Sequence, residues 1–363
     1  MSRYVRRRVG QLVIAGFSGS TISDDLRLVA REFGLGGVIL FDRNVEAPQQ
    51  VAELAYEAQQ LSSELPLWVS IDQEGGRVAR LREPFTVWPP MQTLGRSGEA
   101  TLARQFAKAL AAELLTVGIS LDFAPVLDVH TNAGNPVIGD RALSEDANTV
   151  ARLGGEMIAA LQADGVAACG KHFPGHGDTT VDSHHGLPVV DHGPDRLRDV
   201  ELVPFREAVA RDVAMIMTAH VLYPALDPDA PATISPRIVS GMLREEMGFG
   251  GVVATDDMSM RGIAEGRSIE AASVEAIAAG CDVVLLCEPS AEQQMATLEA
   301  IIHAVEGDGL SLTRVEDALT RGLKVKERFL SQMPDWQPPP PQGMERLGCD
   351  EHVAVAASMR RYA

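Results

Sequence analysis

The sequence has little lysine, few aromatic residues and no long apolar run, and these shortages exclude whole classes of protein. Only four lysines occur in 363 residues, and 32 basic side chains stand against 50 acidic ones, giving a formal net charge of −18. Because a chain this acidic repels phosphate groups, we expect it to bind neither nucleic acid nor an anionic membrane surface. No apolar run reaches about 18 residues, so no transmembrane helix is predicted.

The N-terminus and the cysteines bear on location. A group of arginines precedes an apolar run, but the run is short and Gln11 and Gly16 interrupt it. We therefore expect no signal peptide. The four cysteines include no CxxC pair, and three lie in apolar surroundings, which predicts reduced thiols in a cytoplasmic protein; they are Cys169, Cys281, Cys287 and Cys349.

Short apolar runs alternate with helical patterns along nearly the whole chain. Eight runs lack polar alternation, as strands buried on both faces do: 11–17, 37–41, 67–72, 120–129, 166–172, 213–220, 251–256 and 281–287. The stretches with apolar residues at helical spacing are 47–63, 99–117, 146–164, 194–211, 236–247, 269–279, 291–305 and 313–330.

Eight strands interleaved with helices predict a single closed (β/α)8 barrel. The alternative is a doubly wound open sheet of the Rossmann type, but GFSGS stands after the first strand in place of GxGxxG. The segment PDWQPPPPQG is unsuited to a helix or a central strand. We therefore predict a catalytic barrel over residues 1–333 and a proline-rich C-terminal extension over 334–363 that runs across the surface.

Most predicted strands end in a charged residue or a histidine, at the end of a barrel where active sites lie. Core packing does not explain this pattern, and helix capping accounts for one or two of the acids at most. The residues are Asp72, Asp128, Lys171 with His172, His220, and Asp256 with Asp257.

The loop after the fifth strand, KHFPGHGDTTVDSHHGLP, has two readings. As a metal site it offers His172, His176, Asp178, Asp182, His184 and His185 as ligands. As an acid/base loop it offers Asp182 and His184, one residue apart, where a tight turn brings the carboxylate to the imidazole. We expect His185 and His192 to be solvated loop residues.

The seventh strand delivers two adjacent acids in TDDMSM. Because side chains alternate along a strand, one of Asp256 and Asp257 faces the barrel axis and the other faces away. One of them is thus available as a nucleophile, while its neighbour caps a helix or supports the site. Spacing alone does not say which.

These motifs together resemble those of a known family. GGVILFDRNV, IDQEGGRVARL, DFAPVLDV, KHFPGHGDTTVDSHHGLP and TDDMSM look like the signature segments of glycoside hydrolase family 3 β-N-acetylglucosaminidases of the NagZ type, which act in bacterial cell-wall recycling. The resemblance runs from about Gln11 to about Leu330 and implies a barrel-fold retaining exo-glycosidase. It implies no metal and no cofactor, with muropeptides or anhydro-disaccharides as substrates, and we expect a monomer.

The resemblance also implies a role for individual positions. Asp256 corresponds to the catalytic nucleophile, and His184 to the general acid/base with Asp182 as its partner. The residues that correspond to the binding site for N-acetylglucosamine are Asp72, Arg80, Arg141, Lys171 and His172.

Other functions remain open from the sequence. Within the same family, a β-glucosidase or a β-N-acetylglucosaminide phosphorylase would use the same residues. From another class, a barrel metallohydrolase would use the histidine-rich loop as ligands. A non-catalytic sugar-binding barrel is the third alternative, although a pure binder has no need of a nucleophile.

Overall fold

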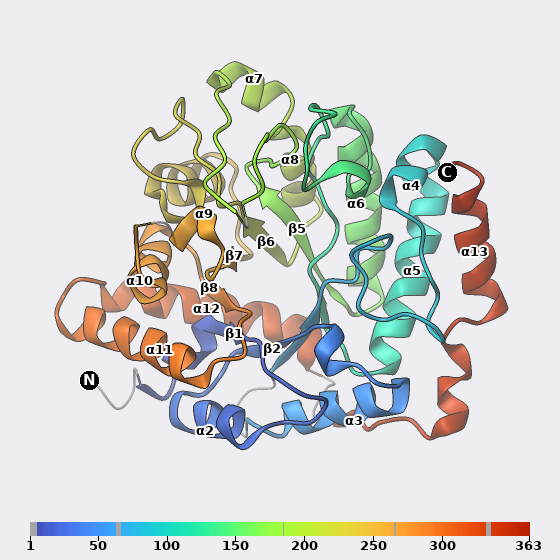
Figure 1. Cartoon of the computed structure of the whole chain (residues 1–363), viewed down its shortest axis with the longest axis horizontal. Coiled ribbons are helices and arrows are strands. Elements are labelled where there is room, and N and C mark those ends of the chain that lie inside the picture. The colour runs from blue at the N-terminus through green and yellow to red at the C-terminus, as the bar shows by residue number, and fades with distance from the viewer. Residues whose placement is uncertain (1–5, 63–66, 184, 265, 332–334) are drawn as a thin grey trace.

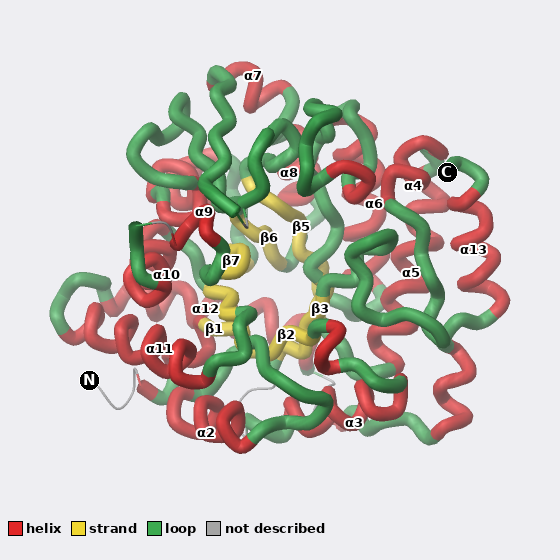
Figure 2. The backbone as a smooth tube through the Cα atoms, viewed as in Figure 1, coloured by secondary structure: helices red, strands yellow, loops and turns green. Residues whose placement is uncertain are grey.

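The computed structural model describes residues 6–62, 67–183, 185–264, 266–331 and 335–363. Eight parallel strands pair in chain order and β8 closes on β1, so the predicted (β/α)8 barrel is confirmed. Helices surround the strands (Figures 1 and 2). The strands are β1 (Val13–Ala15), β2 (Gly37–Leu40), β3 (Trp68–Ile71), β4 (Leu121–Asp122), β5 (Ala167–Phe173), β6 (Met215–Thr218), β7 (Val252–Asp257) and β8 (Val283–Leu286).

The strands are apolar on both faces because each face is buried. Inward-facing side chains such as Ile14, Ile39 and Leu285 form a cluster inside the barrel. The outward-facing side chains pack with the surrounding helices in a second, larger cluster. Trp68, at the start of β3, belongs to the inner cluster and lies 6.5 Å, ring centre to ring centre, from Phe329 of α12. The inner core therefore meets a helix at the amino ends of the strands, and this leaves the carboxyl ends for the site.

The eight predicted stretches are all helical, although two differ in form, and the helices over 24–33, 91–97, 261–264 and 350–360 were not predicted. Predicted helix 194–211 is two helices, the second of which begins with Pro204 in its first turn, and predicted helix 236–247 is a wide π-helix, η5 (Arg237–Glu246). The α-helices are α2 (Asp24–Phe33), α3 (Pro48–Gln59), α4 (Met91–Ser97), α5 (Ala100–Thr116), α6 (Ala147–Ala163), α7 (Pro194–Asp199), α8 (Val203–Ala210), α9 (Arg261–Ala264), α10 (Ile269–Ala279), α11 (Ala291–Glu306), α12 (Leu312–Leu330) and α13 (Asp350–Arg360).

Strand β4 is much shorter than the predicted strand over 120–129. Pro125 has no N–H to donate, so regular pairing stops after Asp122. The chain nevertheless continues along β5, because Cys169 N–H donates to Ala124 O (2.9 Å) and Leu127 N–H donates to Lys171 O (2.6 Å). Asp128 is thus still delivered to the carboxyl end of the barrel.

The C-terminal extension packs on the outside of the barrel. Its helix α13, which the sequence analysis did not predict, lies beside α4 and α5 (Figure 1). The buried carboxylate of Glu113 on α5 accepts hydrogen bonds from Gly348 N (2.9 Å) and His352 Nδ1 (2.8 Å). The boundary at residue 333 stays a prediction. Across the described ranges, no helix is both long enough and apolar enough to cross a bilayer.

The carboxylate of Asp282, just before β8, holds three arginines at the amino end of the barrel. It is 0% exposed and pairs with Arg244, with Arg314 (2.6 Å) and with Arg321 (3.0 Å). Removing the buried anion leaves these cations without their partner.

We expect Asp282→Asn to lower the free energy of unfolding by about 3 kcal/mol, measured by urea denaturation. The matched control is Asp212→Asn, whose pair with Arg328 involves a carboxylate that is 88% exposed, and we expect it to change stability by less than about 1 kcal/mol. Equal stability of the two variants would show that the three-arginine cluster does not stabilise the barrel.

Candidate active site

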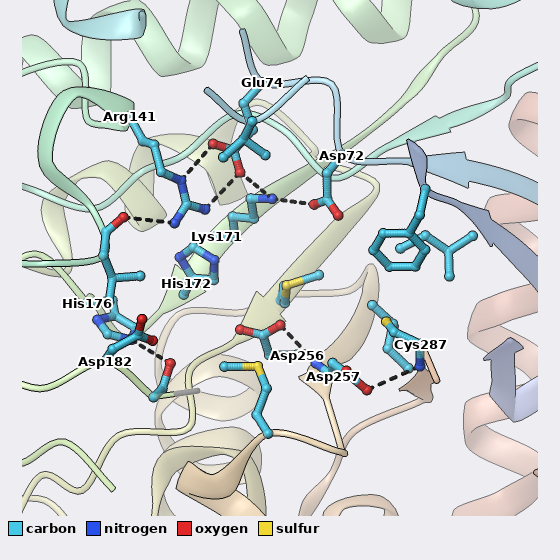
Figure 3. Close-up of a pocket in the computed structure, with 18 of the residues that line it drawn as sticks. Asp72, Glu74, Arg141, Lys171, His172, His176, Asp182, Asp256, Asp257 and Cys287 are labelled. Carbon is cyan, nitrogen blue, oxygen red and sulfur yellow. Dashed lines mark hydrogen bonds and ion pairs between the residues drawn. The ribbon is translucent and has the colours of Figure 1, made fainter. Parts of the chain in front are cut away.

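A cavity of about 370 Å³ opens at the carboxyl ends of the strands (Figure 3). Seven of the eight side chains proposed from the sequence line it, and the eighth, His184, lies outside the described residues. The seven are Asp72, Arg80, Arg141, Lys171, His172, Asp182 and Asp256. The strand ends thus bring together residues that lie up to 184 positions apart in the chain.

One wall of the cavity is a network of charges around Lys171. The Lys171 Nζ atom lies 2.7 Å from Asp72 Oδ1 and 2.6 Å from Glu74 Oε1. Glu74 in turn accepts two hydrogen bonds from the Arg141 guanidinium, at 2.8 and 2.9 Å. Figure 3 shows these four side chains meeting on one side of the cavity. Glu74, which is buried, therefore fixes both cations of this wall.

The network keeps its members charged. Burial works against the charge of Glu74, but Arg141 and Lys171 outweigh it and hold the Glu74 pKa well below its usual value. Burial likewise works against the charge of Lys171, but Asp72 and Glu74 outweigh it and hold the Lys171 pKa above its usual value. At neutral pH the wall therefore presents fixed donors and fixed acceptors to a ligand.

The aromatic side chain of Phe41 also lines the cavity. The Phe41 ring, after β2, has the Arg43 guanidinium at 4.4 Å and the Arg80 guanidinium at 5.3 Å from its centre. Arg80 Nη2 also lies 3.5 Å from Asp72 Oδ2. Arg80 is thereby held between an aromatic face and a carboxylate at the cavity wall.

Asp128 orients His172. Its Oδ2 lies 2.7 Å from His172 Nδ1, and its Oδ1 accepts the backbone N–H groups of His172 (3.2 Å) and His176 (2.6 Å). These bonds overcome the effect of burial, which would raise the Asp128 pKa, and together with the nearby His172 and His176 they lower it. The sequence predicted Asp128 at a strand end but suggested no role for it. The structure shows that it holds His172 and His176 in place.

The two acids that end β7 differ in their surroundings. Asp257 accepts from Ser259 Oγ (2.5 Å) and from Cys287 N (3.1 Å), so it organises the loops around it. Asp256 faces His172 across the cavity floor (Figure 3). Burial would raise the pKa of Asp256, but the nearby His172 side chain and the N–H of Asp257 (2.8 Å) lower it. Asp256 is therefore an ionised carboxylate with oxygen lone pairs available to a ligand.

His220, which follows β6, bonds to the backbone at the end of β7. Its Nε2 lies 3.0 Å from the carbonyl oxygen of Asp257, and its Nδ1 lies 2.8 Å from Thr233 Oγ1. Burial lowers the His220 pKa, so the ring is neutral at neutral pH. A carbonyl accepts only, so Nε2 carries the proton and Nδ1 accepts.

Asp182 lies at the opposite side of the cavity from Asp72 (Figure 3). Its backbone carbonyl accepts from His185 N (2.9 Å) and Gly186 N (3.2 Å), so the chain turns tightly after it. His185 is exposed, as expected. His192 is a partly exposed loop residue, and its Nε2 lies 2.6 Å from Asp178 Oδ2.

The metal-site reading finds no support in the geometry. Among the residues that the structure describes, no three His, Cys, Asp or Glu side chains converge as metal ligands would. His172 instead bonds to Asp128 through Nδ1, and both ring nitrogens of His176 bond to hydroxyl groups.

Sequence reasoning missed three residues that shape the site. Glu74 stands two positions after Asp72 in the same IDQEGG segment, but nothing in the sequence showed that two cations converge on it. His220 was seen as a strand end, and His176 was considered only as a metal ligand. Their actual partners are hydroxyl and carbonyl groups, which leave no trace in residue spacing.

Comparison with known proteins decides the family. Residues 4–325 match the model described as "Glycosyl hydrolase family 3 N terminal domain". The chain belongs to glycoside hydrolase family 3. The beta-hexosaminidase of Nitrosomonas eutropha is 39% identical over 323 residues, which cover 86% of this chain and 92% of that protein. Beta-hexosaminidase A of Pseudoalteromonas piscicida is 38% identical over 341 residues and 85% of this chain, but the match spans only 56% of its length.

Solved structures of the family share the barrel. The glycoside hydrolase family 3 β-N-acetylglucosaminidase from Paenibacillus sp. str. FPU-7 is 43% identical with a TM-score of 0.95, covering 99% of this chain and 68% of that one. NagZ from Neisseria gonorrhoeae, solved in complex with N-trifluoroacetyl-D-glucosamine, is 31% identical with a TM-score of 0.78, covering 99% of both chains. The resemblance on which the sequence analysis relied is confirmed.

The buried carboxyl of Asp122, at the end of β4, gives stability a pH dependence. Burial raises its pKa to about 7. Its Oδ1 accepts from Gln73 N (2.9 Å), while Oδ2 has no hydrogen-bond partner among the described residues. Because the folded pKa exceeds the ordinary value near 4, the stability that Asp122 contributes is full below pH 4 and is lost as the pH rises through 7.

We therefore expect Asp122→Asn, which keeps an acceptor for Gln73 N–H, to raise the urea midpoint at pH 8 and to leave it nearly unchanged at pH 5. The measurement is urea unfolding at both pH values. A variant that is less stable than the wild type at pH 8 would contradict the assignment of a raised pKa.

Proposed function

We propose that this chain is a retaining exo-β-N-acetylglucosaminidase that removes terminal N-acetylglucosamine from peptidoglycan fragments through a covalent glycosyl-enzyme. Membership of family 3 and its beta-hexosaminidase relatives support the reaction class. The observation that carries the proposal is the placement of ionised Asp256 across the cavity from a wall of fixed hydrogen-bonding charges, Asp72, Lys171 and Arg141.

Asp256 acts as the nucleophile. Retention of configuration needs a carboxylate that attacks the anomeric carbon and an acid that protonates the leaving oxygen. A lowered pKa keeps Asp256 anionic, and its position at the cavity floor matches attack on a sugar held above it. The ester that forms between Asp256 and the sugar is then hydrolysed by water.

The wall around Lys171 binds the sugar. Asp72 accepts hydrogen bonds from adjacent hydroxyl groups, while Lys171, Arg80 and Arg141 donate them. His172, oriented through Nδ1 by Asp128, presents Nε2 to the cavity. A sugar hydroxyl both donates and accepts, so a wall of alternating carboxylates and cations suits it.

Asp182 and His184 supply the acid and the base. Asp182 lines the cavity, and His184 follows two residues later in the chain. Histidine suits both half-reactions because its ordinary pKa near 6.5 lets it donate a proton and then take one from water near neutral pH. Asp182 orients the ring and stabilises its protonated form.

The finer assignments belong to the same proposal. We assign muropeptides and anhydro-disaccharides as substrates, no cofactor or metal, a monomeric state and a cytoplasmic location. The four cysteines are free, and two of them are fully buried, which agrees with a reducing compartment. The C-terminal extension, described over residues 335–363, packs on the outside of the barrel.

The first experiment compares release of nitrophenol from the β-N-acetylglucosaminide and the β-glucoside. We expect wild type to cleave the former and Asp256→Asn to lose activity by about 10³-fold or more, because the variant lacks the anionic nucleophile. Asp212→Asn, at an exposed turn, serves as the matched control and keeps wild-type activity.

Phosphate and EDTA complete the design. Activity that is indifferent to both supports the hydrolase. A requirement for phosphate would identify a phosphorylase. Loss of activity with EDTA would indicate that the histidine-rich loop binds a metal ion. Cleavage of the β-glucoside alone would identify a β-glucosidase instead.

A further inference from the structure

His176 is fixed at its backbone by two buried partners. Its N–H donates to Asp128 Oδ1 (2.6 Å), and its carbonyl accepts from Asn135 Nδ2 (2.8 Å). The residue is 1% exposed. The ring therefore projects from a rigid base, next to the carboxylate that also holds His172.

The ring bridges two hydroxyl groups of the loop that leads to the acid/base pair. His176 Nδ1 lies 2.8 Å from Thr179 Oγ1, and Nε2 lies 3.1 Å from Ser183 Oγ. Burial and the nearby His172 lower the His176 pKa to about 4. The ring is thus neutral at neutral pH, and one nitrogen donates while the other accepts, which suits hydroxyl groups that do either.

Ser183 is also held from the opposite side, by the segment that follows the nucleophile. Its carbonyl accepts from Gly262 N (2.9 Å), at the start of α9. A Cβ at position 262 would lie 3.0 Å from Ser183 O and 3.1 Å from His220 O, so a larger residue would push these carbonyl groups by a few tenths of an ångström. Ser183 therefore joins the loop after β5 to the loop after β7.

We propose that His176 and Ser183 are positioning residues that hold the acid/base segment in register with the strand that carries Asp256. Ser183 directly follows Asp182 in the chain, so fixing its hydroxyl and its carbonyl fixes the chain next to Asp182. Figure 3 shows His176 and Asp182 on the same side of the cavity. This inference rests on the proposed function, because it concerns delivery of the proton to the leaving oxygen.

The test uses leaving groups that differ in their need for an acid. A sugar alkoxide leaves only when it is protonated, whereas 2,4-dinitrophenolate leaves without help. We expect Ser183→Ala to lower kcat/KM on an N-acetylglucosaminyl disaccharide by about tenfold or more, and on the 2,4-dinitrophenyl glycoside by less than about twofold. A general loss of structure would lower both equally.

Two substitutions of His176 separate its two bonds. Gln places its amide nitrogen or oxygen near the position of Nε2 and keeps contact with Ser183, whereas Asn reaches only the position of Nδ1 and keeps contact with Thr179. We expect His176→Asn to reproduce the defect of Ser183→Ala, and His176→Gln to restore at least half of the loss. The Asn and Ala changes should not add in the double variant, because they remove one shared bond.

Ser273→Ala is the matched control. Its hydroxyl is equally buried but bonds to Ile269 O within α10, away from the cavity, so we expect wild-type kcat/KM on both substrates. Equal losses on both substrates in Ser183→Ala, no loss on either, or additive losses in the double variant would overturn the inference.

His184→Ala distinguishes failure of the inference from failure of the proposed function. The proposed function itself would be wrong if the wild type cleaved neither the disaccharide nor the 2,4-dinitrophenyl glycoside. It would also be wrong if His184→Ala lowered kcat/KM equally on both substrates. If His184→Ala shows the leaving-group dependence and Ser183→Ala does not, only the positioning role fails.

Discussion

The ammonium group of Lys171, buried between Asp72 and Glu74, is the interaction on which the rest of the site depends. Isolated charges are costly to bury, so each member of this network needs the others. Lys171 comes from β5, the two acids follow β3, and Arg141 comes from the loop after β4. The network therefore forms only when β3, β4 and β5 are paired, and that pairing fixes the direction of its donors and acceptors.

The same electrostatics separate the two sides of the cavity. The wall holds its carboxylates in ion pairs, so they bind rather than react. Asp256 lies apart from those pairs, with one oxygen bonded to a backbone N–H and the His172 side chain nearby. Its charge is stabilised without being neutralised by direct contact, as a nucleophile requires. One cavity thus contains carboxylates with two different roles, and their surroundings set the difference.

The barrel could be predicted from the sequence because buried parallel strands are apolar on both faces, and eight such runs alternate with helical patterns. Local breaks were harder to place. Pro125 ends regular pairing in β4, and the predicted helix over 194–211 divides before Pro204. Helix α13 was not predicted, because the prolines before it indicated an extension without regular structure.

The site residues at strand ends were visible because a charge after an apolar strand is unusual. Glu74 and His176 carried no such signal. Each acts through a contact with residues from another part of the chain, Arg141 for Glu74 and Asp128 for His176, and sequence spacing does not report such contacts. Their importance follows from burial and from hydrogen-bond partners, which only the folded chain shows.

The most direct test of the account is the mass of the enzyme during turnover. In His184→Ala the glycosyl-enzyme forms readily from the 2,4-dinitrophenyl glycoside, but it is hydrolysed slowly because water lacks its base. Acid quenching followed by peptide mass spectrometry should find one N-acetylhexosamine residue on the peptide that contains Asp256. An adduct on another residue, or a burst of dinitrophenol without any adduct, would contradict the assignment of Asp256 as nucleophile.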